Sequence, residues 1–207
     1  MHASPRPLLP PCIIIASMLL ILASGSSRRQ ELLRNAGFTF EVRPSSIPEE
    51  PRPDETPEAF VQRMAAEKAL EVAARSPAES LVLGADTVVV VGAEILNKPG
   101  NSEEAARILR ELSGRSHRVL TGVCLVKAPR TIEARGESDT RVWFRPLAED
   151  EIRDYVATGE PLDKAGAYGI QGRASRFVTR IEGCYFNVVG LPVALVDEML
   201  RPFLKAR

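Results

Sequence analysis

Hydroxyl and guanidinium groups are concentrated in one short segment, Ser24–Arg29 (Ser-Gly-Ser-Ser-Arg-Arg). An apolar run precedes it and a helix is expected to follow, so backbone N–H groups, the hydroxyls of Ser24 and Ser26, and Arg28 and Arg29 should converge. Such a turn can cradle phosphate. The GxxxxGK[ST] spacing of a P-loop is absent, so kinase or GTPase chemistry is not supported. The alternative is a serine-rich helix cap with surface arginines.

A carboxylate interrupts an otherwise apolar, β-prone stretch at Gly84-Ala85-Asp86-Thr87. An unpaired buried charge is costly, so Asp86 should meet a metal, a cation or the mouth of a cleft, and Thr87 would share its site. The alternative is that Asp86 only forms a turn between two strands.

Two lysines and a glycine-rich segment complete the candidates. Lys98 lies beside Pro99 at a break between elements and is the better phosphate ligand, whereas Lys68 alone is predicted to be a surface charge. The segment from Asp163 to Gly172 combines small residues with Asp163, Lys164 and the Gln171 amide, which could recognise a nucleobase edge. Its alternative is an ordinary glycine-rich loop around a packed tyrosine.

Other catalytic signatures are weaker or missing. His117, at the start of an expected strand, favours a structural role. No GxSxG elbow or paired Cys/His signature indicates acyl transfer. Cys12, Cys124 and Cys184 are odd in number and widely spaced, which argues against disulfides or a zinc site and favours a reducing, cytoplasmic location.

The elements that must position these groups alternate between strand and helix. The expected strands span 18–23, 38–42, 81–91, 94–96, 119–126, 140–144, 177–181 and 185–189, the last two forming a pair. The expected helices span 28–35, 57–75, 102–113 and 148–158, with a further amphipathic helix from Leu191 onward. This order predicts an α/β fold with a mixed, twisted sheet flanked by helices.

Composition indicates one globular domain. The 207 residues are 44% hydrophobic and 26% charged, and the formal net charge is zero. No overall field favours a nucleic-acid polymer or an anionic membrane, so any anion site must be local. The apolar run at the N-terminus is too short to span a bilayer and is needed as the first strand. We therefore expect residues 1–17 to be a non-functional extension, Met18 to be the true start, and 18–207 to form the domain.

Several separated motifs together resemble the Maf family of nucleotide pyrophosphatases. They are Leu22–Arg29, Glu67-Lys68, Gly84–Thr87, Asn97–Pro99, Leu112–Gly114 and Gly159–Gly172. The resemblance covers about 18–203. It implies a fold similar to inosine triphosphate pyrophosphatases, with two lobes around a cleft and, in many members, a homodimer.

The resemblance also implies a reaction and roles for residues. Family members hydrolyse a nucleoside triphosphate to the monophosphate and pyrophosphate with a divalent cation, Mg²⁺ or Mn²⁺. Asp86 would accept the proton of the attacking water, and Glu49 would help Asp86 hold the metal. Phosphate contacts would come from Arg28, Arg29, Lys68 and Lys98.

Within the family, the chain resembles the branch that acts on dTTP and UTP. The resemblance lies at Arg28, Thr87 and the segment that ends with Gln171, where the 7-methyl-GTP branch differs. An amide can pair with N3–H and O4 of uracil or thymine, but it can also turn over to suit cytosine. Gln171 alone therefore does not set the specificity.

Two other functions remain to be weighed. The family name derives from septum formation, so one alternative is a nucleotide-binding regulator of cell division with weak catalysis. Such a regulator would bind nucleotide without releasing pyrophosphate. A simple phosphatase would release orthophosphate instead.

Overall fold

The computed structural model describes residues 18–204, so the predicted extension at 1–17 lies outside the described residues. The strands are β1 (Leu20–Leu22), β2 (Glu41–Val42), β3 (Leu81–Val91), β4 (Glu94–Leu96), β5 (Ser116–Lys127), β6 (Thr131–Phe144) and β7 (Val178–Glu182). The α-helices are α1 (Ser27–Asn35), α2 (Pro57–Ala74), α3 (Ser102–Leu112), α4 (Glu149–Val156), α5 (Tyr185–Val189) and α6 (Val193–Leu200). There are also short 3₁₀ turns, η1 (Glu160–Asp163), η2 (Ala165–Ala167), η3 (Arg173–Phe177) and η4 (Arg201–Phe203).

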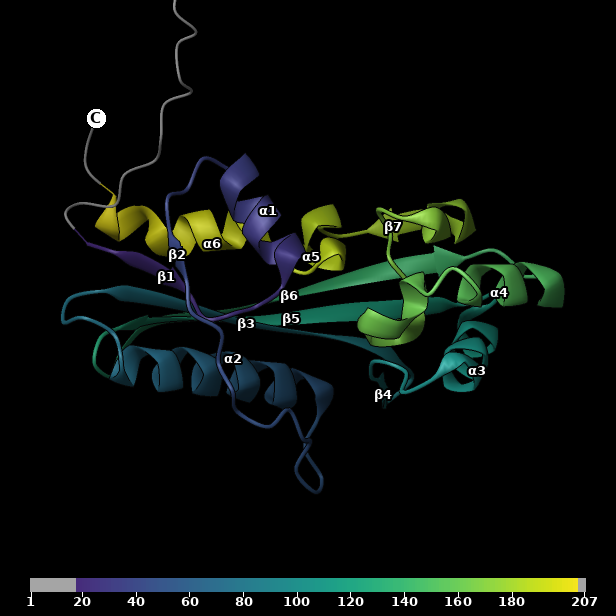
Figure 1. Ribbon diagram of the computed structural model, residues 1–207, viewed down its shortest axis with the longest axis horizontal. Helices are drawn as coiled ribbons and strands as arrows, with labels where there is room; N and C mark the ends of the chain where they lie inside the picture. Colours follow the sequence, from purple (N-terminus) through teal and green to yellow (C-terminus); the bar gives the residue numbers. More distant parts are fainter. Residues whose placement is uncertain (1–17, 205–207) are drawn as a thin grey trace, which may run out of the picture.

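The strands form one mixed sheet in the order β2-β1-β3-β5-β6-β7, with β4 paired to β3 (Figure 1). β1 runs parallel to β2 and β3, whereas the pairs β3–β5, β5–β6 and β6–β7 are antiparallel. The predicted mixed α/β fold is confirmed. Among residues 18–204 no helix is long and apolar enough to cross a membrane.

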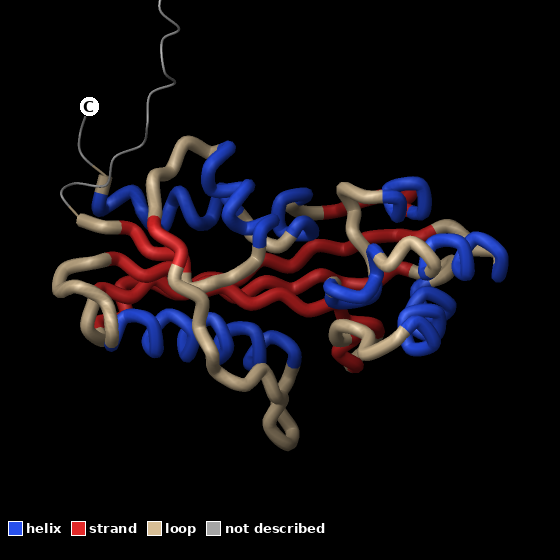
Figure 2. Tube along the Cα trace, in the orientation of Figure 1, coloured by secondary structure: helices blue, strands red, loops and turns tan. Residues whose placement is uncertain are grey.

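Helices cover both faces of the sheet (Figure 2). α2 packs on one face against alternate apolar residues of β1, β3 and β5, including Ile21, Val82 and Cys124. The opposite face packs against α1, α3, α4 and α6 through the other set of alternating residues, such as Leu83 and Leu125. Period-two alternation along β3 therefore decides which helix each side chain meets.

Helix α2 approaches the sheet closely because two glycines face it. A Cβ atom at Gly84 would overlap the Ala65 carbonyl oxygen, and one at Gly122 would overlap the Val61 carbonyl oxygen. In the register of the neighbouring strands β3 and β5, Gly84 lies opposite Cys124 and Gly122 lies opposite Asp86, so the two glycines are offset by two positions. Their missing side chains let the helix backbone lie directly on the strands.

The predicted boundaries of β5 and β6 were too short. Strand β6 begins at Thr131, nine residues before the predicted 140, and pairs with β5 along nearly its whole length. The first half of β6 is polar and partly exposed, so its sequence lacks the apolar alternation that marked the second half.

The predicted strand pair at 177–181 and 185–189 was wrong in its second member. β7 pairs with β6, and Tyr185–Val189 forms α5. The Thr140 hydroxyl exchanges hydrogen bonds with the backbone of Cys184, at 3.1 and 3.2 Å, and Gly183 adopts a φ of +120°. The chain thus leaves the sheet edge, and the buried Asn187 amide donates to the Val119 carbonyl and the Thr140 hydroxyl.

We expect Gly84→Ala to destabilise the fold by about 3 kcal/mol, because the added methyl group must push α2 off the sheet. Urea unfolding would measure the loss. Gly100→Ala is the matched control, since a Cβ there meets only Glu104 Oε2 at 3.4 Å. Equal stability of the two variants would contradict the close-packing argument.

Candidate active site

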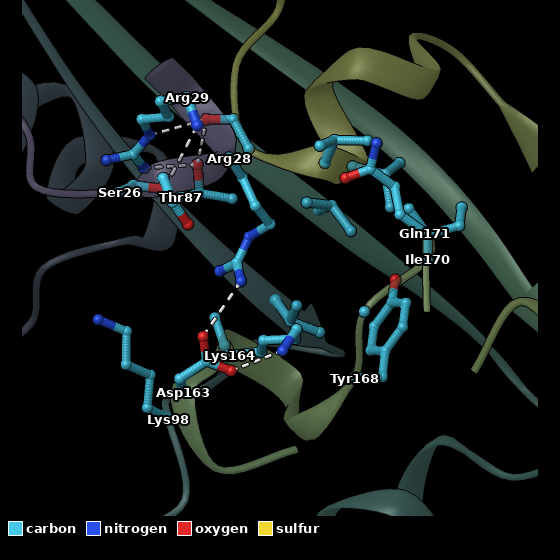
Figure 3. Close-up of a pocket in the computed structure, with 18 of the residues that line it drawn as sticks. Ser26, Arg28, Arg29, Thr87, Lys98, Asp163, Lys164, Tyr168, Ile170 and Gln171 are labelled. Carbon is cyan, nitrogen blue, oxygen red and sulfur yellow. Dashed lines mark hydrogen bonds and ion pairs between the residues drawn. The ribbon is translucent and has the colours of Figure 1, made fainter. Parts of the chain in front are cut away.

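One cleft of about 800 Å³ lies where the start of α1, β3 and the segment 160–172 meet. Figure 3 shows Arg28 extending between the α1 turn and Asp163, with Gln171 on the other side of the cleft. The charged residues that line the cleft are Arg28, Arg29, Lys68, Lys98, Lys164, Glu49, Asp86, Glu160 and Asp163. The cations come from four separate parts of the chain and can together neutralise a polyanion.

At the base of the cleft an ammonium group lies between two carboxylates. Lys68 Nζ contacts Asp86 Oδ1 at 2.6 Å and Glu49 Oε1 at 2.5 Å. Asp86 is 5% exposed and Lys68 6%, so this ion pair is shielded from water, whereas Glu49 lies at the surface. Asp86 is thus a buried carboxylate in the middle of a continuous strand, and the alternative of a turn is wrong.

The interpretation of Lys68 as a surface charge was wrong. The residue lies on the face of α2 that packs against the sheet, and α2 is close enough for its side chain to reach Asp86. Burial raises the pKa of Glu49, but the hydrogen bond and charge of Lys68 outweigh this effect and the pKa is lowered overall. Glu49 is therefore ionised at neutral pH.

Arg29 is held by hydrogen bonds on three sides. Its guanidinium donates to the Gly190 carbonyl at 2.8 Å, to Ser24 Oγ at 3.0 Å and to Thr87 Oγ1 at 3.0 Å. Burial lowers the pKa of Arg29, while the charges of Asp86 and Glu49 act in the opposite direction. Ser24 is buried and supports Arg29, so its hydroxyl is a neighbour of a cleft residue and not itself part of the lining.

The turn before α1 has the geometry expected of an anion site. Ser26 caps the helix, and its Oγ accepts from the backbone N–H of Arg29 at 3.4 Å. Ser26 and Arg28 both line the cleft beside the exposed N-terminus of α1. Helix N-termini of this kind favour negative ligands.

Arg28 crosses the cleft to the glycine-rich segment. Its Nη1 contacts Asp163 Oδ2 at 3.3 Å, and Lys164 Nζ contacts the other Asp163 oxygen at 2.6 Å. Lys98 lines the same space from the loop after β4 and is exposed. Asp163 therefore already offers Arg28 and Lys164 the kind of negative charge that a phosphate would bring.

The glycine-rich segment is anchored by a buried tyrosine. The Tyr168 hydroxyl lies 2.8 Å from His117 Nε2, and both rings pack edge to face with Phe144. Burial lowers the pKa of His117 to about 4, so the ring is neutral at pH 7. The structural role expected for His117 is borne out by these contacts, and Gln171 projects from the segment at an exposed position.

Glu160 is a cleft residue to which sequence reasoning assigned no role. Its carboxylate accepts from the Tyr155 hydroxyl at 2.9 Å and from the Arg173 backbone N–H at 3.1 Å. It belongs to the Gly159-Glu160-Pro161 motif, and that was the one signal available. One hydrogen-bond partner, Tyr155, precedes Glu160 in the sequence and the other, Arg173, follows it, so the spacing of residues could not reveal these contacts.

Glu49 and Asp86 are the residues that fit a divalent cation. No group of three or more His, Cys, Asp or Glu side chains within 18–204 could hold a metal ion. Two carboxylates that already share one cation, the Lys68 ammonium, nevertheless suit Mg²⁺, which usually takes one or two carboxylates plus substrate phosphates. The carboxylates of Glu49 and Asp86 would therefore hold the cation only together with phosphate oxygens of a bound ligand.

Comparisons with known proteins agree with this chemistry. The sequence model of the Maf family, described as Maf-like protein, matches residues 19–203. A dTTP/UTP pyrophosphatase of Koribacter versatilis is 52% identical over 184 residues, covering 89% of this chain and 94% of the relative. The dTTP/UTP pyrophosphatase of Moorella thermoacetica is 53% identical, with the same coverage of 89% and 94%.

Similarity to solved structures is lower. A nucleoside-triphosphatase / dITP/XTP pyrophosphatase from Mycobacterium abscessus superposes with a TM-score of 0.41 and 14% identity, covering 63% of this chain and 76% of that one. The family assignment therefore depends on the sequence matches.

We expect Lys68→Met to destabilise the protein by about 3 kcal/mol, because it leaves the buried Asp86 carboxylate without a partner. Mg²⁺ or Mn²⁺ should then raise the melting temperature of the variant more than that of the wild type. Thermal unfolding with and without each cation measures both effects. Lys127→Met is the control, since it removes an exposed ion pair with Glu79 and should change the stability little. Equal destabilisation by the two substitutions would argue against a special role of the Lys68 pair.

Proposed function

The chain belongs to the Maf family, and from this premise we propose that it hydrolyses dTTP and UTP to the monophosphate and pyrophosphate. The observation that carries the proposal is the cleft, in which one buried carboxylate, Asp86, faces a wall of cations. Relatives with about half of their residues identical, over nearly their whole length, are named dTTP/UTP pyrophosphatases.

In this proposal the triphosphate lies along the cationic side of the cleft. The N-terminus of α1 with Ser26, Arg28 and Arg29 would contact phosphate oxygens, and Lys98 would approach from the opposite loop. Ser24 would act through Arg29, which it holds in place. Phosphate oxygens would compete with Asp163 for Arg28 and Lys164, so binding exchanges one ion pair for another.

Asp86 would orient the attacking water and accept its proton. A carboxylate fixed in a cleft can do so when the phosphorus atom lies beyond the water. Lys68 contacts the same carboxylate and would help neutralise the charge that develops on the leaving pyrophosphate. Glu49, the second carboxylate on Lys68, would complete this acidic and basic cluster.

A divalent cation, Mg²⁺ or Mn²⁺, would be held by Glu49 and Asp86 together with the triphosphate. When bound, such an ion neutralises phosphate charge and makes a coordinated water more acidic. The Glu49–Lys68–Asp86 cluster supports this placement, because its two carboxylates converge on one point.

The base would lie against the glycine-rich segment, where the Gln171 amide makes no hydrogen bond to residues 18–204 and is free to pair with N3–H and O4 of uracil or thymine. Thr87 would act indirectly, because its hydroxyl holds Arg29 and contacts Thr121. The expected homodimer and the cytoplasmic location stay predictions.

The enzyme is favoured over the regulator of septum formation. The closely related proteins carry enzyme names, and the four basic residues expected to contact phosphate, Arg28, Arg29, Lys68 and Lys98, all line the cleft. A simple phosphatase would need no site for the base.

The full chain, incubated with dTTP, UTP, 7-methyl-GTP and ATP plus Mg²⁺ or Mn²⁺, should release pyrophosphate chiefly from dTTP and UTP. Ion exchange separates pyrophosphate from orthophosphate. The Asp86→Asn variant should turn over at least about 100-fold more slowly yet still bind nucleotide, because it keeps the shape but cannot accept a proton. Nucleotide binding without turnover in the wild type would favour the regulator, and orthophosphate would favour the phosphatase.

Gln171→Glu should lower kcat/KM for dTTP and UTP by about tenfold or more, because a carboxylate can accept from N3–H but cannot donate to O4. Activity on guanine nucleotides, whose neighbouring N–H groups suit a carboxylate, should fall less. Steady-state kinetics with UTP and with GTP give the ratio of the two kcat/KM values for each protein. An unchanged ratio would refute base recognition by Gln171.

A further inference from the structure

The side of the cleft proposed to face the base ends in a tight turn, Gly169–Gly172, and residues packed behind this turn fix its shape. The Gly172 N–H donates to the Gly169 carbonyl at 2.9 Å, and Gln171 lies at the exposed corner between them. Because the Gln171 amide has no hydrogen bond to the described part of the chain, nothing on the amide itself fixes where it points. Its direction depends on whatever holds the turn.

A carboxylate and a phenol hold this turn. Glu160 Oε2 accepts from the Arg173 N–H at 3.1 Å, just after the turn. The Tyr155 hydroxyl accepts from the Gly169 N–H at 3.2 Å, at its start, and donates to Glu160 Oε1 at 2.9 Å. Both ends of the turn are thereby connected through one hydrogen-bonded pair.

The turn is also fitted sterically around Glu160. A Cβ atom at Gly172 would overlap the Glu160 carboxylate, and one at Gly169 would lie 2.7 Å from Lys164 Cε and 3.3 Å from Glu160 Oε1. The glycines therefore let the backbone wrap closely around the carboxylate. A looser association would not require glycine at either position.

The pair is itself rigidly mounted. Tyr155 lies on α4, is 1% exposed and packs edge to face on Phe177 with ring centroids 5.3 Å apart. Burial raises the pKa of Tyr155, and the hydrogen bond and charge of Glu160 also raise it, so the hydroxyl remains protonated and keeps donating. Gly159, with a φ of +74°, turns the chain after α4 and brings Glu160 back beside Tyr155.

Glu160 is poorly placed to serve as a further acidic ligand beside Glu49 and Asp86. Both of its carboxylate oxygens accept hydrogen bonds, one from a side chain and one from the backbone. Within 18–204 it forms no metal-binding group with other acidic residues. The hydrogen bonds of Glu160 thus stabilise the turn and leave neither oxygen free of a partner.

We infer that Glu160 and Tyr155 are positioning residues for base selection, which hold the Gly169–Gly172 turn so that the Gln171 amide faces the base. The inference rests on the proposed function and adds to it two residues that touch neither phosphate nor base. The preference of the enzyme for uracil over cytosine then depends on Glu160 and Tyr155. Its affinity for the triphosphate group does not depend on them.

The test compares Tyr155→Phe and Glu160→Ala with the wild-type full chain. Both should raise KM for UTP about tenfold, the size expected from one or two lost hydrogen bonds, with little change in kcat. The ratio of kcat/KM for UTP to that for CTP should fall by a similar factor, and Kd for inorganic triphosphate, measured calorimetrically, should stay within about twofold. Glu160→Gln keeps one acceptor oxygen for the Arg173 N–H and should recover part of the ratio.

Tyr185→Phe and Glu198→Gln are matched controls at exposed positions outside the cleft and should leave the ratio unchanged. The ratio of two substrates does not depend on the fraction of folded protein, so reduced stability cannot mimic the result. An unchanged ratio in both Tyr155→Phe and Glu160→Ala, or equal losses for UTP and inorganic triphosphate, would overturn the positioning role. A wild type that releases no pyrophosphate from UTP would instead defeat the proposed function.

Discussion

The close approach of α2 to the sheet is the constraint on which the cleft depends. Because Gly84 and Gly122 present no side chains, the helix backbone rests on β3 and β5, and Lys68 reaches Asp86 two residues beyond Gly84. Burying either charge alone would cost several kcal/mol, so each residue makes the position of the other tolerable. The sheet face that packs against α2 thereby also carries the carboxylate to which we assign the proposed reaction.

Carboxylates form ion pairs with the cations of the cleft at two places. Asp163 pairs with Arg28 and Lys164, while Glu49 and Asp86 pair with Lys68. These contacts keep the cations oriented and limit their mutual repulsion. They also mean that the net gain from binding a polyphosphate is smaller than the number of cations suggests, because existing ion pairs are lost as new ones form.

The sequence was informative where a residue conflicted with its local surroundings. Asp86 inside an apolar strand and the run of small residues up to Gln171 both indicated a site, and both line the cleft. The local pattern wrongly placed Lys68 at the surface, because its helix shows little separation of apolar and polar faces and only the packing of α2 reveals that it is buried. The strand predicted at 185–189 was wrong for a similar reason. Its residues are β-prone, but the long-range hydrogen bonds of Asn187 to Val119 and Thr140 hold them in a helix instead.

Arg29 joins the beginning of the described chain to its end, through the Gly190 carbonyl 161 positions later. A ribosome releases the chain from the N-terminus, and early elements can fold before later ones emerge. The sheet can therefore begin to form while the guanidinium of Arg29 still lacks one of its partners. Completion of the cleft must wait until Gly190 has been synthesised, so a shorter nascent chain would carry Asp86 without a fully fixed Arg29.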